Sequence, residues 1–163
     1  MINKKYLKLL RSSNRYRENN FIYKLIAERI VDSIDLLKIN IDNILEIGIN
    51  DNNVSDFLIN KFKYQNFDRA DLHIPKSFKN KKNNFLEIDL ENLSLKSDFY
   101  NLVYSNTFIH LIDFENILKI IYKSLKPNGF MIAAIPSKDS MYQLLNSMYE
   151  TDLDLYNGAY QRF

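Results

Sequence analysis

The chain contains no cysteine and only two histidines, and no apolar run approaches the length that spans a membrane. The absence of cysteine excludes disulfides, thiolate zinc sites and cysteine nucleophiles, and it is compatible with a reducing compartment. The N-terminus also lacks the apolar core of a signal peptide. We therefore expect a cytoplasmic protein with no membrane span.

The net charge of +2 is too small to indicate a nucleic-acid partner, and none is expected. A hydrophobic content of 46% and an aromatic content of 13% are globular values. With 163 residues there is room for one domain with a proper core. We expect a single domain over 1–163, made of an N-terminal helical segment (1–38), a core (40–150) and an irregular tail (151–163).

Short apolar runs alternate with stretches of helical spacing along most of the chain. Strands are expected at 40–47, 67–72, 85–88, 99–105 and 130–135, and helices at 21–37, 54–62, 113–125 and 137–148. Asp113 is a plausible N-cap, and Pro127-Asn128-Gly129 ends the helix that follows it. Such alternation predicts an α/β fold with a parallel sheet and helices on both faces.

Polar residues follow the ends of four of these strands. Parallel sheets bind ligands at the carboxyl ends of their strands, near the switch in strand order. Any one of these residues could be a solvated turn residue, whereas together they suggest a rim around one ligand. They are Glu46, Gly48, Asp71, Asp89, Ser105 and Asn106.

Residues 1–20 are basic, with six lysines and arginines against one acid, Glu18. A solvated helix or arm at one edge of the domain is the favoured interpretation, and a partner-binding patch is the alternative.

Two stretches carry a resemblance to a known family. Asn101–His110 ends a strand in Ser-Asn and continues to a histidine, and Leu125–Phe130 reads Leu-Lys-Pro-Asn-Gly-Phe after a helix. This order resembles the class I S-adenosylmethionine-dependent methyltransferases. Within that class the sequence is similar to the branch that contains the malonyl carrier-protein O-methyltransferases and a mitochondrial complex I assembly factor described as an arginine hydroxylase. Residues 14–37 and 140–162 resemble flanking segments of that branch.

The resemblance implies a Rossmann-like fold, S-adenosylmethionine as cofactor and a role for each strand end. Glu46 and Gly48 would face the methionine part, with Ser105 on the same rim, and Asp71 would accept the ribose hydroxyls, with Asp68 a rival. Asp89 and Leu90 would hold the adenine. Asn106 and His110 would line the side where the methyl acceptor enters, although a packed histidine is an alternative for His110.

The loop after the first strand departs from the family pattern. Glycine at its second and third positions would let the backbone approach the cofactor, and this chain has Asn50 and Asn52 there. Asn50 can adopt the left-handed conformation but brings a side chain to where the cofactor should lie. Asp51, Asn52 and Asn53 are good N-caps whose side chains would take the backbone N–H groups that a ligand carboxylate needs. We expect weakened cofactor binding.

The family sheet has seven strands, and no residues remain here for the last two. The fifth strand would then be an exposed apolar edge, which natural proteins normally cover. Either the chain is a fragment, or it is a shortened copy that forms a homodimer or docks on a partner at this edge.

Three functions follow from the resemblance. The first is methyl transfer to a small molecule or a carrier-bound acyl group, with His110 as the candidate base only if the acceptor needs deprotonation. The alternative is a degenerate scaffold factor, for example in the assembly of respiratory complex I. Arginine hydroxylation ranks last, because oxygen chemistry commonly uses two histidines and a carboxylate on a metal, and no such spacing, and hence no metal site, is recognisable.

Overall fold

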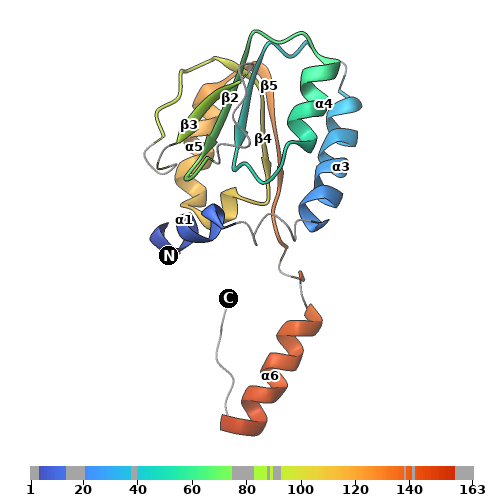
Figure 1. The fold of residues 1–163 in the computed structure, drawn as a ribbon, viewed down its shortest axis with the longest axis vertical. Coiled ribbons are helices and arrows are strands. Elements are labelled where there is room, and N and C mark those ends of the chain that lie inside the picture. The colour runs from blue at the N-terminus through green and yellow to red at the C-terminus, as the bar shows by residue number, and fades with distance from the viewer. Residues whose placement is uncertain are drawn as a thin grey trace.

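Five parallel strands form one sheet in the order β3-β2-β1-β4-β5 (Figure 1). This computed structural model describes residues 4–13, 21–37, 40–74, 83–87, 89, 93–137, 139–140 and 142–156. The expected α/β fold with a parallel sheet is confirmed. The strands are β1 (Asn43–Ile47), β2 (Asn66–Asp71), β3 (Asn84–Glu87), β4 (Tyr100–Asn106) and β5 (Leu125–Ala134).

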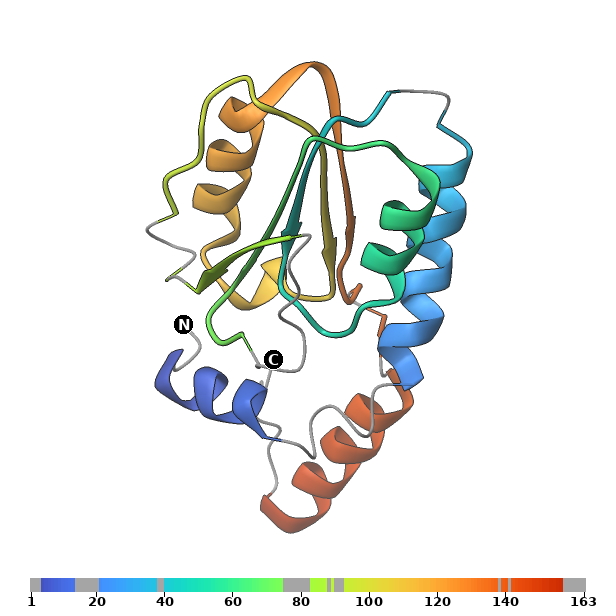
Figure 2. The same cartoon turned by 45° about the horizontal axis from the view of Figure 1, so that its top comes forward.

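Helices cover both faces of this sheet (Figure 2). The helices α3 and α4 pack on one face and α5 on the other, while α1 and the 3-10 turn η3 lie by the carboxyl ends of the strands. Their bounds are α1 (Lys4–Ser12), α3 (Phe21–Asp35), α4 (Asn53–Lys61), η3 (Ile109–Leu111), α5 (Phe114–Ser124) and α6 (Tyr142–Tyr156). No helix in the described part of the chain is long and apolar enough to cross a bilayer.

The two faces of the sheet explain the apolar pattern of β1. All five of its residues are buried. Ile44 packs with α3 and α4, whereas Leu45 and Ile47 pack with α5. A strand covered on both faces needs apolar side chains in both directions, and in β1 these are Ile44, Leu45 and Ile47.

The helix α5 begins where the sequence predicts it. The carboxylate of Asp113 accepts a hydrogen bond from the backbone N–H of Asn116 at 3.1 Å, which is the expected N-cap. At its other end the structure differs from the expectation. β5 begins directly at Leu125, which pairs with Tyr100. The next pair along the two strands is Leu102 with Phe130, so the register shifts across the segment that contains Asn128 (φ +63°).

β5 lies at the edge of the described sheet, with β4 as its only strand neighbour there. Most of its apolar residues are half-buried, Ala133 is exposed, and Ile135 just beyond the strand is 47% exposed. The apolar edge expected from the sequence is therefore present among the described residues. Docking of a partner or a second copy on it stays a prediction.

α6 lies beyond the carboxyl ends of the strands, away from the sheet (Figure 1). It begins at Tyr142 and continues to Tyr156, whereas the sequence predicted an earlier start and an irregular tail from residue 151. Five large apolar side chains on it are exposed, among them Leu153 and four that are more than half exposed, and with so little burial no helical period marks its last turns. These four are Tyr142, Tyr149, Leu155 and Tyr156.

Candidate cofactor site

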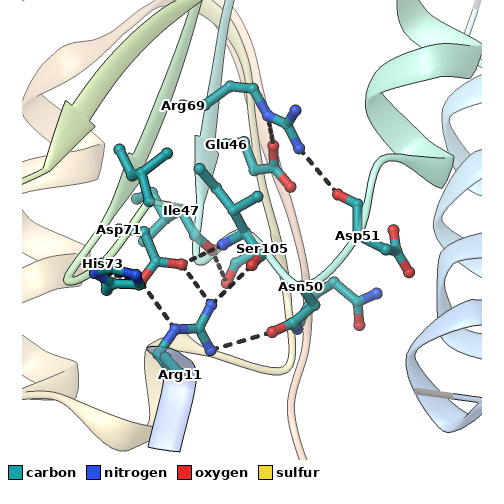
Figure 3. A network of polar contacts seen from close by, with 12 residues as sticks. Arg11, Glu46, Ile47, Asn50, Asp51, Arg69, Asp71, His73 and Ser105 are labelled. Atoms are coloured by element: carbon teal, nitrogen blue, oxygen red, sulfur yellow. Dashed lines mark hydrogen bonds and ion pairs between the residues drawn. The ribbon is translucent and has the colours of Figure 1, made fainter. Parts of the chain in front are cut away.

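The carboxyl ends of β1, β2 and β4 meet at one edge of the sheet, and the candidate residues gather there. β1 lies between β2 and β4 and is parallel to both. Gly48 follows the last residue of β1, Asp71 ends β2 and Asn106 ends β4. Figure 3 shows Asp71, Asn50 and Ser105 close together around the guanidinium of Arg11.

Gly48 holds the turn after β1 in a conformation that side chains rarely adopt. Its φ is +84°, and its N–H donates to the carbonyl of Ala70 at 2.9 Å. A Cβ built on Gly48 would lie 2.2 Å from the Cβ of Phe108. The glycine thus makes room for Phe108, while the predicted contact with the methionine part of a cofactor stays a prediction.

Asp71 is fully buried, and four N–H groups donate to its carboxylate. The Nε of Arg11 donates to Oδ1 at 2.8 Å, and its Nη2 forms a second, short contact with Oδ2. The backbone N–H of Ile49 donates to Oδ2 at 2.6 Å, and that of His73 to Oδ1 at 3.3 Å. The rival Asp68 instead accepts from the hydroxyl of Tyr100 at 2.6 Å, away from this edge.

Arg11 was expected to be solvated, and that expectation is wrong for this residue. Its side chain is 2% exposed. Besides Asp71, it donates to the Oδ1 of Asn50 and to the carbonyl of Ile49, both at 3.1 Å, and it lies 4.5 Å over the ring of Phe108. One signal in the sequence marks it: Arg11 lies one helical turn after Leu7, the apolar anchor of α1, on the same face.

Asn50 also turns its side chain toward Arg11 and the end of β4, while its predicted overlap with a cofactor stays a prediction. The side chain is buried, and its Nδ2 donates to the carbonyl of Asn106 at 2.5 Å. Its Oδ1 accepts from Arg11. The hydroxyl of Thr107 donates to the same carbonyl at 2.8 Å, so the two side chains together occupy this backbone acceptor at the end of β4.

The predicted N-caps behave differently from one another. Asp51 precedes the N-cap position and accepts a hydrogen bond from the backbone N–H of Asn53, the first residue of α4, at 2.9 Å. Asn52 stands at the N-cap position of α4 but makes no capping hydrogen bond. Its Oδ1 instead accepts from Arg69 at 2.8 Å.

Arg69 on β2 supports this loop from beneath. It is fully buried, and its Nε forms a short ion pair with Glu46 on β1. Its Nη2 donates to the carbonyl of Asp51 at 2.9 Å. Burial raises the pKa of Glu46 above its ordinary value, and the charge of Arg69 opposes that rise. Glu46 thus pairs with Arg69, and its predicted contact with a cofactor stays a prediction.

At the end of β4, two polar residues stabilise the chain. Ser105 is buried and donates to the carbonyl of Ile47 at 2.7 Å, which ties β4 to β1. The side chain of Asn106 donates to the carbonyl of Tyr23 on α3 at 2.8 Å. The next residue, Thr107, has φ +52°, which is rare for a β-branched residue. Its N–H donates to the carbonyl of Ala134 at 2.9 Å and holds this conformation.

His110 lies half-buried in η3, and its Nδ1 is buried with no hydrogen-bond partner among the described residues. Burial lowers the pKa of His110 below its ordinary value of 6.5, so the imidazole is neutral at neutral pH. Asp89 is exposed beyond β3. Leu90 and the stretch Gly158–Arg162 lie outside the described residues.

Two hollows open on the described surface. One, of about 510 Å³, adjoins the Arg11–Asp71 pair and is lined by Lys5, Tyr6, Lys8, Leu9, Ser12 and His73. The other, of about 660 Å³, lies where α5 meets β5, around Pro127 and Tyr122. No group of three histidines or acids among the described residues is arranged to hold a metal ion.

A parallel sheet with this strand order, a glycine turn after β1 and a carboxylate at the end of β2 has the features of a nucleotide-type cofactor fold. The family model described as "Methyltransferase domain" matches residues 45–133, more than half of the chain. The chain belongs to this family, within the class I S-adenosylmethionine-dependent methyltransferases. The predicted family is confirmed.

Two curated relatives share a name. The chain is 34% identical over 118 residues to a malonyl-[acyl-carrier protein] O-methyltransferase of Calditerrivibrio nitroreducens, an alignment that covers 71% of the chain and 47% of the relative. It is 28% identical over 166 residues to malonyl-[acyl-carrier protein] O-methyltransferase 2 of Ilyobacter polytropus, which covers 95% of the chain and 63% of the relative. The chain thus spans between 47% and 63% of their length.

Solved structures agree on the fold. The plantazolicin methyltransferase BpumL, solved with SAH, superposes with a TM-score of 0.65 at 20% identity and covers 94% of this chain and 68% of that one. A methyltransferase solved in complex with a Haloferax volcanii methyltransferase activator gives 0.66 at 16% identity, covering 83% and 62%. At such identities the likeness shows the fold alone, and it confirms the Rossmann-like methyltransferase fold.

Proposed function

We propose that the protein uses S-adenosylmethionine to methylate the free carboxylate of a carrier-bound malonyl group. One observation of the structure supports this most strongly: Gly48, Asp71 and Asn106 meet at one edge of a methyltransferase sheet. The acceptor is taken from the two relatives that are named for it. These relatives are enzymes, and they give no support to the scaffold alternative.

The hydrogen-bond acceptors at this edge of the sheet fit the chemistry of an adenosyl cofactor. The carboxylate of Asp71 can accept two hydrogen bonds from a ribose diol, and the carbonyl of Asn106 can accept one from an ammonium group. When bound, the cofactor would supply an electrophilic methyl group on a sulfonium. In the structure, however, Arg11 and Asn50 hold these two acceptors, which supports weak binding of the cofactor. Contacts of Asp89 and Leu90 with the adenine stay predictions.

For the methyl acceptor, the protein mainly has to position the reacting group and keep water away from it. Methyl transfer is an in-line displacement, so the gain comes from holding the reacting atoms in line in a dry pocket. A malonyl carboxylate is already ionised at neutral pH and needs no base. We assign His110 and Asn106 to the positioning of this acceptor, and the strained Thr107 between them agrees with a functional role.

The first test is the reaction itself. The purified full chain should bind S-adenosylhomocysteine in a calorimetric titration, and with S-adenosylmethionine it should raise the mass of a malonyl-loaded acyl carrier protein by one methyl group. The unloaded carrier and an acetyl-loaded carrier are the controls, since neither has the free carboxylate. The absence of both heat at millimolar ligand and methylated carrier would contradict the proposal.

The second test concerns His110. If the acceptor is a carboxylate, His110→Gln should lower kcat/KM by less than about tenfold, whereas loss of a general base typically costs about 10²–10⁴-fold. For the same reason, wild-type kcat/KM should stay level as the pH falls from neutrality to below 6.5. The ordinary pKa of a histidine is 6.5, and burial lowers the pKa of His110 from that value. A decline below that pH that His110→Gln abolishes would instead assign it as a base, since only the neutral imidazole can accept a proton.

A further inference from the structure

The guanidinium of Arg11 uses all three of its nitrogens inside the candidate cofactor site. Nε and Nη2 hold the two oxygens of Asp71, Nη1 holds Asn50, and Nη2 also reaches the carbonyl of Ile49. The central carbon of the group, Cζ, lies over the ring of Phe108, 4.5 Å from its centroid. Arg11 is therefore bound much as a small cationic ligand would be, with a fork that matches the carboxylate.

This arrangement leaves Asp71 no capacity for a ribose. An ionised carboxylate offers about four acceptor positions. In the structure two are used by Arg11, one by the N–H of Ile49 and one by the N–H of His73. The backbone donors belong to the loops that shape the site, so Arg11 is the donor that can leave.

Resting on the function proposed above, we propose that Arg11 is an internal competitor of the cofactor, so that α1 must release Asp71 before the ribose can bind. The occupied state is the one that the structure shows. The cofactor binds the released state, and its apparent affinity is reduced by the fraction of molecules in that state.

The attachment of α1 is light enough to permit this release. The helix has nine residues, and helices of that length are marginal by themselves. Its other anchors include the buried Leu7 and a surface ion pair of Lys8 with Glu87 at 3.2 Å, in which both side chains are more than a third exposed. Tyr6 and Leu9 on its outer side are 58% and 66% exposed. Arg11 is thus the main polar anchor of α1.

The test compares ligand binding by the wild-type chain with that of Arg11→Met and Arg11→Lys. Arg11→Met should bind S-adenosylhomocysteine about tenfold or more tightly, because it removes the competing state. Arg11→Lys keeps the charge but loses the fork, and it should lie between the two. Adenosine should show the same gain and adenine none, since only adenosine carries the ribose. Lys8→Met removes a cation from the same helix but only a surface ion pair, and it should raise the affinity by less than about fivefold.

The outcomes separate this proposal from the proposed function. Binding by the wild-type chain with no gain in Arg11→Met, or with a loss, overturns the competition and leaves the function standing. Binding by Arg11→Met alone supports the competition, whereas a wild-type chain that neither binds nor methylates contradicts the proposed function. No binding by any variant overturns both. If Arg11→Met fails to fold, as circular dichroism would reveal, the gain expected for Arg11→Lys decides.

Discussion

Replacing Arg69 with methionine is expected to lower the free energy of unfolding by about 3–5 kcal/mol at neutral pH, because it leaves the carboxylate of Glu46 buried without a counter-charge. The same change removes two hydrogen bonds to the loop, at the carbonyl of Asp51 and the amide of Asn52. Urea unfolding followed by far-UV circular dichroism measures the loss.

The stability that Arg69→Met loses should be larger at neutral pH than at acid pH. Burial already raises the pKa of Glu46 above 4.5, and removal of Arg69 takes away the charge that opposes this rise. The folded variant then binds a proton more tightly than the unfolded chain does. Its stability relative to wild type is therefore best below the unfolded pKa and falls as the pH rises through the folded pKa. The deficit should widen from acid toward neutral pH.

Two controls separate a buried charge from the loss of any ion pair. Lys61→Met breaks the surface pair with Asp35, whose side chains are 40% and 51% exposed, and should cost less than about 1 kcal/mol. The double variant Glu46→Leu with Arg69→Met removes both charges and should recover much of the loss. A deficit for Arg69→Met no larger than that of Lys61→Met, or one that does not change with pH, would count against this account.

Much of the fold could be predicted because the burial of a parallel sheet leaves a local pattern. The short apolar run of β1, which is interrupted by Glu46, and the capped, amphipathic helix α5 were both located from their own residues. The start of β5 was not, because Pro127-Asn128-Gly129 has the composition of a turn. Only the pairing of Leu125 with Tyr100, across the register shift, makes that segment part of the strand.

The candidate site was less accessible to such reasoning. The strand ends that carry Gly48, Asp71 and Asn106 were found, because each follows an apolar run. The partner of Asp71 was not, since Arg11 lies 60 residues away and belongs to a basic segment typical of a solvated helix. The partner of Glu46 was not found either, because its pairing with Arg69 depends on β1 and β2 lying side by side. Such pairings follow from tertiary structure, which no local pattern records.

Gly48→Ala is expected to lower the free energy of unfolding by about 2–4 kcal/mol, for two separate reasons. At a φ of +84° a side chain is strained, which costs about 1 kcal/mol. The added Cβ would also lie 2.2 Å from the Cβ and 2.3 Å from the Cγ of Phe108, which is fully buried and cannot move without repacking. Since the ring of Phe108 lies under Arg11, the displacement should also loosen α1.

Asn128 allows the two costs to be measured separately. It has a φ of +63° and is exposed, so the difference in stability between Asn128→Gly and Asn128→Ala gives the cost of an alanine in left-handed backbone without crowding. Gly48→Ala should exceed that difference by at least about 1 kcal/mol, which is the share due to Phe108. Equal costs at the two positions would mean that Phe108 yields freely. Gly48 would then be required only for the conformation of the turn, and the space next to Gly48 that Phe108 fills could be taken by a ligand.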